Sequence, residues 1–282
     1  MSLLQLKHIC KSFSGVYANE NINLSVEKGE IHALLGENGA GKTTTISLLS
    51  TLLLPTKGEI LIDGQKLTRN RPDLKRKISV ITQEYSMRQD MNMDEIMEYQ
   101  GRLYFMPRKE IKHRTEELLE FCDLIKFRKR TVRKLSGGMK RKLMVCRALL
   151  TDPEILLLDE PTAGMDALSR RQMWNLLRKL NGKNLTILLT THYMEEAQNL
   201  CSRVALMDHG KLEEVNTPAG LIDSLGNYTV DEFAGDETHS HYFHSREEAI
   251  AYLSGLSGQA SLRETTLEDV FVERAGRHLM PS

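Results

Sequence analysis

The sequence is poor in the features that mark membrane-spanning, nucleic-acid-binding and metal-binding chains. No apolar run approaches the roughly 18 residues of a membrane-spanning helix, so a role at a membrane is expected to need a separate subunit. Lys plus Arg and Asp plus Glu each number 38, and the formal net charge of zero argues against a broad nucleic-acid-binding surface. The N-terminal residues lack the pattern of a signal peptide. The cysteines have no metal-ligand spacing and are expected to be reduced structural thiols of a cytosolic protein: Cys10, Cys122, Cys146 and Cys201.

Against these absences stands one glycine-rich stretch, residues 36–44, with the pattern G-x-x-x-x-G-K-[ST]. It follows a predicted buried strand at 30–35 and precedes a predicted helix at 45–53, which is the context that a phosphate-binding P-loop needs. Glycines let the backbone come close to an anion, and the N–H groups of the helix start then face the phosphates. Lys42 supplies a positive charge for the β- and γ-phosphates, and the Thr43 hydroxyl is placed for Mg²⁺.

The length of 282 residues allows one large α/β domain with a small appendage. Alternating strands near 4–9 and 22–26 are expected to form an antiparallel side sheet, and 59–63 reads as another edge strand. The β-branched run 78–82 predicts a central strand that ends at Gln83. A polar residue at the carboxyl end of such a strand lies where α/β sheets place their ligand contacts.

Residues 85–150 are predicted to be helical and are rich in Met, aromatic and charged side chains. Met93 and Met97 are one helical turn apart. We interpret these apolar residues first as the core of a helical subdomain. The alternative is that some of the adaptable side chains form a surface that receives a partner helix.

The sequence indicates a second turn that could bind phosphate, at residues 136–138. Ser136 is a good N-cap, and Gly137 and Gly138 leave backbone N–H groups uncovered before a predicted helix at 139–150. Alone, such a turn is weak support for a ligand site, because most turns of this kind only cap helices.

Two carboxylates end the apolar strand predicted at 155–160, which is the Walker B pattern. Asp159 can hold Mg²⁺, directly or through water. Glu160 comes one residue later, so it leaves the strand in a different direction and can face a water molecule. His192 follows the buried strand predicted at 184–190, at the same edge of the sheet as Asp159.

The rest of the chain completes the core and adds a less strongly patterned tail. The elements predicted there are a helix at 167–180, a hairpin of 203–207 with 211–215, the end of the core near 224, a strand at 228–233 and helices at 245–253 and 266–274. We interpret His239, His241 and His244 as solvated loop residues rather than a metal site, because suitably spaced Cys and acidic partners are lacking.

The order of these motifs resembles the ATP-binding subunit of an ABC transporter over about residues 1–222. The residues that carry the resemblance are the P-loop, Gln83, Leu135-Ser136-Gly137-Gly138, the strand 155–160, Asp166 and His192. Met139 and Met165 depart from the residues common in the family, and neither change removes a reacting group. The resemblance implies an α/β P-loop NTPase (RecA-like) core in residues 1–224, with an antiparallel β subdomain and an inserted α-helical subdomain at about 85–150. A small α+β C-terminal extension, 225–282, follows.

The resemblance also implies a role for each site residue. Phe13 and Tyr17 are both candidates to stack on adenine, with ordinary packing as the alternative for each, and the family pattern favours Phe13. Gln83 matches the Q-loop residue, Asp166 the D-loop aspartate and His192 the switch histidine. The implied catalytic residues are Glu160, His192, Lys42 and Gln83. The implied Mg²⁺ ligands are Thr43, Gln83 and Asp159. The implied ATP-binding residues are Phe13, Gly36, Glu37, Asn38, Gly39, Ala40, Gly41, Lys42, Thr43, Thr44, Gln83, Ser136, Gly137, Gly138, Asp166 and His192.

Members of this family act as head-to-tail dimers that bind two ATP molecules and drive a membrane-spanning permease. The resemblance therefore implies a peripheral protein at the cytoplasmic face of a membrane, with a second copy of itself and a permease as partners, and no nucleic acid. The segments 190–197 and 266–271 are similar to the daunorubicin-resistance, or ABC-2, exporter type. The alternatives are the ATPase of an importer, a soluble ABC ATPase without a transporter, and a nucleotide-gated regulatory protein with little turnover.

Overall fold

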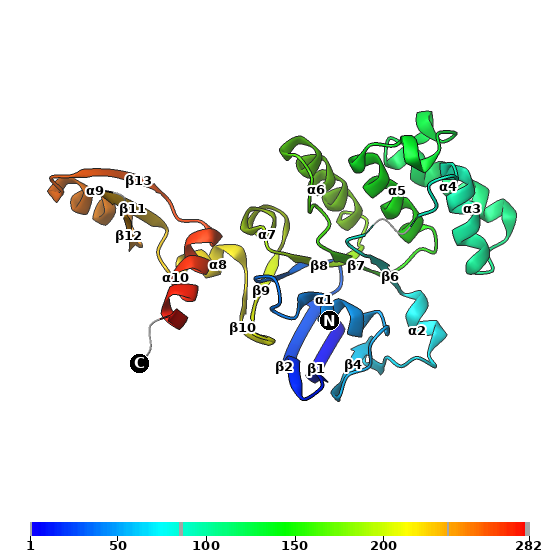
Figure 1. The fold of residues 1–282 in the computed structure, drawn as a ribbon, viewed down its shortest axis with the longest axis horizontal. Helices are drawn as coiled ribbons and strands as arrows, with labels where there is room; N and C mark the ends of the chain where they lie inside the picture. The colour runs from blue at the N-terminus through cyan, green and yellow to red at the C-terminus, as the bar shows by residue number, and fades with distance from the viewer. Residues whose placement is uncertain (1, 85–86, 236, 280–282) are drawn as a thin grey trace. The chain divides into compact units, whose positions relative to one another are not determined.

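The computed structural model describes residues 2–84, 87–235 and 237–279, the last five of these by their backbone alone. The chain divides into two compact units, one of residues 1–192 and 205–214, the other of residues 193–204 and 215–282 (Figure 1). Within the described residues, no helix combines the length and the apolarity needed to cross a bilayer.

A six-stranded sheet is the centre of the first unit. Its strands, in spatial order, are β10 (Lys211–Asn216), β9 (Arg203–Asp208), β3 (Ile31–Leu35), β8 (Thr186–Thr191), β7 (Ile155–Asp159) and β6 (Ile78–Ile81). The pairs β3–β8, β8–β7 and β7–β6 are parallel. Strands β3, β7 and β8 are buried along their whole length, because parallel strands are covered on both faces. These features confirm the predicted α/β class.

The prediction that residues 78–82 form a central strand is wrong, because β6 lies at the edge of the sheet. Its apolar residues are buried through packing on its faces, where helices α2 (Pro72–Arg76) and α5 (Gly137–Leu149) contact it. An apolar run therefore indicates that both faces of a strand are buried. It does not indicate whether the strand has a neighbour on one side or on both.

A second sheet contains β1 (Ser2–Phe13), β2 (Val16–Glu27), β4 (Lys57–Ile62) and β5 (Gln65–Lys66), in the order β2-β1-β4-β5. The antiparallel pairing of β1 with β2 and β4 confirms the predicted side sheet. Strand β4 was expected at the edge but lies between β1 and the short β5, because Gly64, with φ 72°, reverses the chain onto it.

Helix α1 (Lys42–Leu49) follows the P-loop and contacts β7, β8 and β2, so it lies between the two sheets. Figure 1 shows α1 on one side of the six-stranded sheet and α5 and α6 on the other. The helix begins and ends earlier than the predicted 45–53. Its C-terminal boundary is set by backbone geometry, since Thr51 adopts φ 60°, which an α-helix does not allow.

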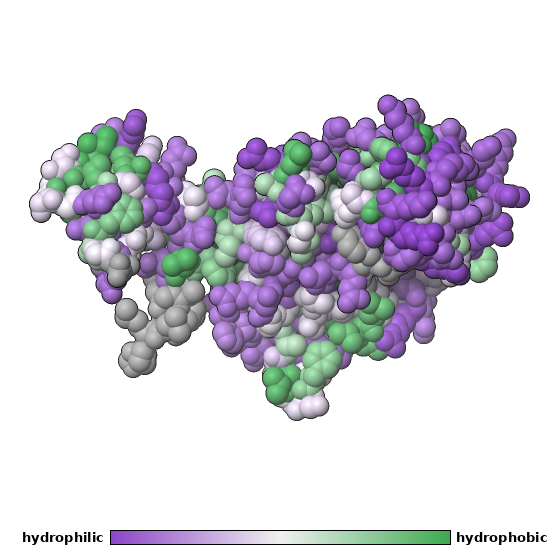
Figure 2. All heavy atoms as spheres, turned by 45° about the horizontal axis from the view of Figure 1, so that its top comes forward, coloured by the Kyte–Doolittle hydropathy of each residue, from purple (hydrophilic) through white to green (hydrophobic). Residues whose placement is uncertain are grey.

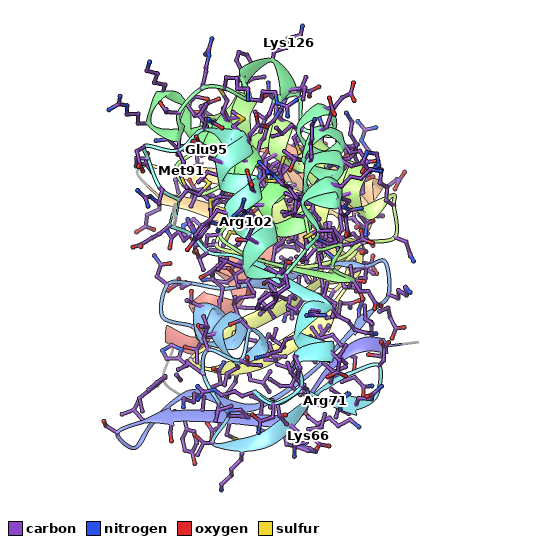
Figure 3. The ribbon with its side chains drawn as sticks, turned by 90° about the vertical axis from the view of Figure 1, so that its right-hand side faces the viewer. Lys66, Arg71, Met91, Glu95, Arg102 and Lys126 are labelled. Atoms are coloured by element: carbon purple, nitrogen blue, oxygen red, sulfur yellow. The ribbon has the colours of Figure 1, made fainter. Side chains whose placement is uncertain are left out.

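The segment predicted to be helical contains α3 (Met93–Leu103), α4 (Arg108–Phe121), two short 3₁₀ turns (Ile125–Phe127 and Val132–Lys134) and α5. Helix α3 begins with a capping box, in which Asn92 and Glu95 each accept a hydrogen bond from the other's backbone N–H. Figure 3 shows Glu95 and Arg102 near the two ends of this helix. The surface over the helical segment is mainly hydrophilic in Figure 2.

The structure bears on the Met and aromatic residues differently: it confirms the subdomain-core interpretation for two methionines, and the partner-helix alternative stays a prediction for the exposed aromatic residues. Met93 and Met97 are fully buried and form the core between the helices. Tyr99, Tyr104 and Phe105 instead face solvent, and Phe105 is 89% exposed. The methionines are therefore structural, and the aromatic residues remain available for a partner.

In the first unit, helix α6 (Ala167–Asn181) buries Trp174, Leu177 and Leu180 along one face. The second unit contains α7 (Met194–Leu200), α8 (Pro218–Asp223), α9 (Arg246–Gly255), α10 (Leu267–Leu279) and an antiparallel sheet of β12 (Glu237–Phe243), β11 (Tyr228–Ala234) and β13 (Gln259–Glu264). Helices α7, α8 and α10 contact one another. For this reason residues 193–204 and 215–224 belong to the same compact unit as the tail. That the ATP-binding domain ends near residue 224 stays a prediction.

In the second unit, Arg263 joins β13 to its neighbours. Its guanidinium donates to Asp231 and Asp269 at 2.6 and 2.7 Å, and the hydrogen bond to Asp269 raises the pKa of Arg263. The loop assignment of His239 and His241 is wrong, since both lie on β12, where each faces a glutamate: Glu237 at 3.5 Å and Glu232 at 3.6 Å. Alternation on a short edge strand is hard to distinguish from a polar loop.

Gly101 tests the packing of the helical segment. An added Cβ would lie 2.5 Å from Ile111 Cγ1 on α4. We expect Gly101→Ala to lose about 1–3 kcal/mol to overpacking against a helix-propensity gain of about 0.5–1 kcal/mol. The net loss, at most about 2.5 kcal/mol, should then lower the thermal unfolding midpoint by up to about 10 °C. Gly255→Ala is the matched control, since nothing lies within 4 Å of its added Cβ. A midpoint for Gly101→Ala at or above that of the control would contradict this account.

Candidate functional site

The P-loop connects β3 to α1 through backbone that only small residues allow. Gly36 is buried, and an added Cβ there would lie 2.1 Å from the carbonyl oxygen of Met207. Gly41, the N-cap of α1, has φ 103°, and its added Cβ would lie 2.4 Å from the carbonyl oxygen of Ala18. The sequence therefore forms this loop because glycine fills positions that no other residue can occupy without displacing backbone.

Lys42 is held above the loop by the loop itself. Its side chain is buried, and Nζ donates to the carbonyls of Gly36 at 2.7 Å and Glu37 at 2.8 Å. Burial lowers the pKa of Lys42, and the negative charges of Glu160, Asp159 and Glu37 oppose that shift. The ammonium is thus fixed in position at the mouth of the loop rather than free to rotate in solvent.

Three oxygen-bearing side chains meet beside the start of α1. Thr43 Oγ1 donates to Asp159 Oδ1 at 3.2 Å, and Thr190 Oγ1 donates to the same oxygen at 2.6 Å. Mg²⁺ is bound by oxygen ligands, commonly one or two carboxylates together with phosphate oxygens. The hydroxyl of Thr43 and the carboxylate of Asp159 are therefore a donor set that fits Mg²⁺.

Glu160 stands at a sharp change of backbone direction just after β7. Its φ is 47°, in the left-handed region that a non-glycine residue seldom adopts, and its N–H donates to Thr190 Oγ1 at 3.0 Å. Its carboxylate is 3.0 Å from His192 Nδ1 and is largely shielded from solvent. Backbone strain of this kind is concentrated at functional sites.

Lys42, Thr43, Glu160 and His192 line one cavity of about 500 Å³. The lining residues are Ala18, Asn38, Gly39, Gly41, Lys42, Thr43, Thr44, Gln83, Glu160, Ala163 and His192. The structure thus brings together most of the residues that the sequence predicted for the triphosphate side of a site. Others lie outside the lining: Phe13, Gly36, Glu37, Ala40, Ser136, Gly137, Gly138, Asp159 and Asp166. Of these, Gly36, Glu37 and Asp159 contact lining residues through the bonds described above.

The second glycine turn is at the exposed start of α5. Ser136 caps the helix by accepting a hydrogen bond from the N–H of Met139 at 3.3 Å. Asp166 caps α6 in the same way, accepting from Ser169 N at 2.9 Å, and the bond from Ser169 lowers the pKa of Asp166. Ser169 is close to this turn, since its Oγ is 3.7 Å from an added Cβ at Gly138. The two caps therefore present neighbouring exposed surfaces.

The two aromatic candidates for adenine stacking are both on the β1–β2 hairpin and both exposed, Phe13 by 47% and Tyr17 by 45%. Figure 2 shows apolar side chains gathered near the tip of this hairpin. Lys11 Nζ lies 5.0 Å from the centre of the Phe13 ring. Ala18, next to Tyr17, lines the cavity. The choice between the two rings stays a prediction in favour of Phe13.

Sequence reasoning missed three residues that support the site. Thr190 bonds both Asp159 and the backbone of Glu160. Asn19 donates to Gly41 O at 3.3 Å and to Thr45 Oγ1 at 3.0 Å. Arg141 is buried on α5. Only Arg141 left a clear signal, because it shares a helix face, at spacings of three, four and seven, with the buried residues Met144, Val145 and Ala148.

Comparison with known proteins gives relatives of one kind. The family description "ABC transporter" matches residues 19–163. The Nod factor export ATP-binding protein I of Cupriavidus metallidurans is 35% identical over 99% of this chain and 99% of its own length. The daunorubicin resistance ATP-binding protein DrrA3 of Streptomyces coeruleorubidus is 37% identical over 78% of this chain and 70% of its own. The linearmycin resistance ATP-binding protein LnrL of Bacillus subtilis is 35% identical over 81% and 73%.

Solved structures give the same result for the fold. The ATP-binding subunit of an ABC transporter superposes with a TM-score of 0.73 at 23% identity, covering 97% of this chain and all of that one. A dimeric ATP-binding cassette in a post-hydrolysis state, bound to ADP and Pi, gives a TM-score of 0.68 at 28% identity. It covers 76% of this chain and 98% of its own. The predicted P-loop NTPase fold is confirmed.

Replacing Lys42 tests whether the loop binds a triphosphate. We expect Lys42→Ala to lose charged hydrogen bonds worth about 1.5–3 kcal/mol, which weakens ATP binding by about 10- to 150-fold. Titration calorimetry measures the change. Lys28→Ala, which removes an exposed lysine elsewhere in the same unit, is the control and should bind normally. Equal affinity in both variants would argue against the assignment of Lys42.

Proposed function

Because this chain belongs to the family of ABC transporter ATP-binding proteins, we propose that it is the ATPase subunit of an exporter whose membrane-spanning permease is a separate protein. The observation that carries the proposal is one cavity lined by the P-loop Lys42, by Thr43 with its bond to Asp159 behind it, and by the Glu160–His192 pair. Relatives of similar length are named for export, and two others for drug resistance. These names favour export over import.

In ATP hydrolysis, each of the residues that line this cavity has a separate role. Glu160 accepts the proton of the attacking water as general base, a contribution of about 10²- to 10⁴-fold. His192, 3.0 Å from the Glu160 carboxylate, fixes its direction and contacts the γ-phosphate. Lys42 and the N–H groups of the P-loop stabilise the charge that develops on the phosphate oxygens. Positioning and electrostatic stabilisation of this kind supply most of the catalysis in phosphoryl transfer.

The donor set beside α1 supports a role for Mg²⁺. Thr43 and Asp159, with Gln83, which also lines the cavity, would hold the ion. When bound, Mg²⁺ neutralises phosphate charge and orients the β- and γ-phosphates. Gln83 then reports the state of the γ-phosphate to the helical segment that follows it in the chain.

A second copy of this chain completes the site in the proposal. The turn at Ser136–Gly138 is an anion-binding helix start that lies outside the lining of the cavity, and it is exposed. Facing the γ-phosphate of a partner copy would use it, and Asp166 would lie beside that contact. ATP then joins two subunits, and hydrolysis lets them separate.

A groove in the first unit supports the permease as a partner. It has a volume of about 520 Å³ and is lined by the end of α1, the start of β6 and the end of α3. Four exposed hydrophobic side chains border it: Leu52, Leu103, Tyr104 and Phe105. Thr82, next to Gln83, also lines it, so an occupant of the groove would be near the residue that senses the γ-phosphate. Such a partner places the chain at the cytoplasmic face of the membrane.

The rival functions are an importer ATPase and a soluble ABC ATPase without a permease. Both share the cavity, so the chemistry does not separate them. Two relatives whose match covers 99% of this chain, its tail included, carry export in their names. That agreement over the tail favours the exporter. The membrane protein that is purified with this chain identifies the function directly.

Glu160→Gln tests the hydrolysis step. The substitution keeps size and hydrogen bonding but removes the base, so we expect ATP binding and ATP-dependent dimerisation with turnover reduced by about 10²- to 10⁴-fold. Phosphate release and size-exclusion chromatography with ATP measure the two properties. Glu237→Gln, an exposed glutamate of the second unit, is the control. Substantial turnover in Glu160→Gln would remove Glu160 from the role of base.

Phe105→Asp tests the groove. We expect the charge to disrupt apolar docking and to reduce co-purification with the permease by at least about tenfold, the effect of roughly 1.4 kcal/mol. ATP binding should stay unchanged. Phe233→Asp alters a 41% exposed phenylalanine of the second unit and serves as the control. If both variants co-purify like the wild type, the groove is not where the permease binds.

A further inference from the structure

Arg141 is a buried cation that the proposed reaction does not use. Its side chain, on the first turns of α5, is 3% exposed. Nε donates to Pro161 O at 2.8 Å, and Nη2 donates to Glu160 O at 2.6 Å. Nη1 donates to Thr82 O at 2.8 Å and to Gln83 O at 3.3 Å. One guanidinium therefore bonds four backbone carbonyls from two different segments.

The acceptors are the residues that directly follow two adjacent strands. Thr82 and Gln83 follow β6, and Glu160 and Pro161 follow β7. The strands end just before these positions, and beyond them the four carbonyls accept from the Arg141 guanidinium. The planar guanidinium has five N–H donors in a fixed fork and can serve both segments at once, whereas a lysine ammonium is a single point charge.

The contact with Glu160 acts on the residue with the strained backbone. Thr190 Oγ1 accepts from the N–H of Glu160, and Arg141 donates to its carbonyl. The peptide groups before and after Glu160 are thus both held by hydrogen bonds, and Glu160 between them has a φ of 47°. This fixation keeps the carboxylate beside His192 in a conformation that costs about 1–3 kcal/mol.

The same guanidinium is covalently part of the helix that begins at the Ser136 turn. Arg141 lies five residues after Ser136, and its bonds reach the backbone of Gln83 as well as that of Glu160. A shift of α5 relative to the sheet would therefore alter two residues of the cavity together. Arg141 thereby connects the position of the helix to the geometry of the cavity.

We propose that Arg141 is a positioning residue, which holds Glu160 and Gln83 in their hydrolysis-competent arrangement only while α5 is seated against the sheet. The inference rests on the proposed ATPase function. It makes the start of α5 more than a contact for a partner's phosphate. Through one side chain, the position of that helix sets the geometry of the catalytic base in its own subunit.

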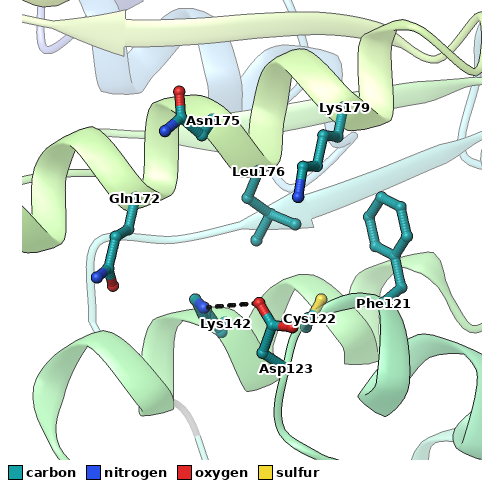
Figure 4. A pocket seen from close by; sticks show the side chains of 8 residues that line it. All are labelled: Phe121, Cys122, Asp123, Lys142, Gln172, Asn175, Leu176 and Lys179. Atoms are coloured by element: carbon teal, nitrogen blue, oxygen red, sulfur yellow. Dashed lines mark ion pairs between the residues drawn. The ribbon is translucent and has the colours of Figure 1, made fainter.

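Arg141→Lys is the test, with Arg141→Gln as a second variant. For each we expect the turnover number to fall at least tenfold, while the KM for ATP changes by less than threefold. Turnover is normalised to the fraction of protein that binds ATP, determined by titration, so partial misfolding does not enter the result. Lys142→Ala is the matched control on the same helix. Its side chain forms an ion pair with Asp123, with the two charged groups 3.8 Å apart (Figure 4).

A double-mutant cycle with Glu160→Gln separates positioning from general stability. If Arg141 acts through Glu160, Arg141→Lys lowers the residual hydrolysis of Glu160→Gln by a smaller factor than it lowers that of the wild type, measured with radiolabelled ATP, and any loss that remains is due to its contact with Gln83. An equal loss in both backgrounds, or normal turnover in Arg141→Lys, overturns the inference. A wild-type protein that neither binds nor hydrolyses ATP, alone or with its permease, overturns the proposed function instead.

Discussion

Where a parallel strand ends, its last peptide groups lose the neighbours that paired them along the sheet. The cavity lined by Lys42, Glu160 and His192 lies at three such ends, and it is built from the groups that satisfy them. After β3, the carbonyls of Gly36 and Glu37 accept from Lys42. After β7, the N–H of Glu160 donates to Thr190 and its carbonyl accepts from Arg141. After β6, the carbonyls of Thr82 and Gln83 accept from the same guanidinium.

This requirement explains why a stable fold and a reactive site coincide. The peptide groups are hydrogen-bonded by charged or hydroxyl side chains, and those side chains are thereby fixed in position. Preorganised charge of this kind needs no reorganisation during the reaction, so it stabilises developing negative charge efficiently. The strained φ of Glu160 and the burial of Lys42 are unfavourable contributions that this arrangement offsets.

Much of the fold was predictable because short segments of the sequence specify their own secondary structure. The runs of apolar residues at β7 and β8 and the glycine loop before α1 each specify their structure within about ten residues. The position of β6 at the sheet edge was not predictable, since sheet order is set by contacts between distant segments. The difference in burial between Met93, which is buried, and Phe105, which is exposed, likewise depends on how α3 packs against α4 and α5.

For the site, the sequence named the residues that face the cavity but missed those behind them. Motifs describe groups that touch a ligand, whereas Thr190 and Asn19 act on other protein atoms. The bonds of Arg141 show a further reason. The four oxygen atoms that accept from it belong to the main chain, so replacing the side chains at these positions leaves the acceptors in place. Such a contact imposes no choice of amino acid on its partners. In a set of diverged relatives it would produce an invariant arginine with no covarying position, and pairwise coevolution would not detect it.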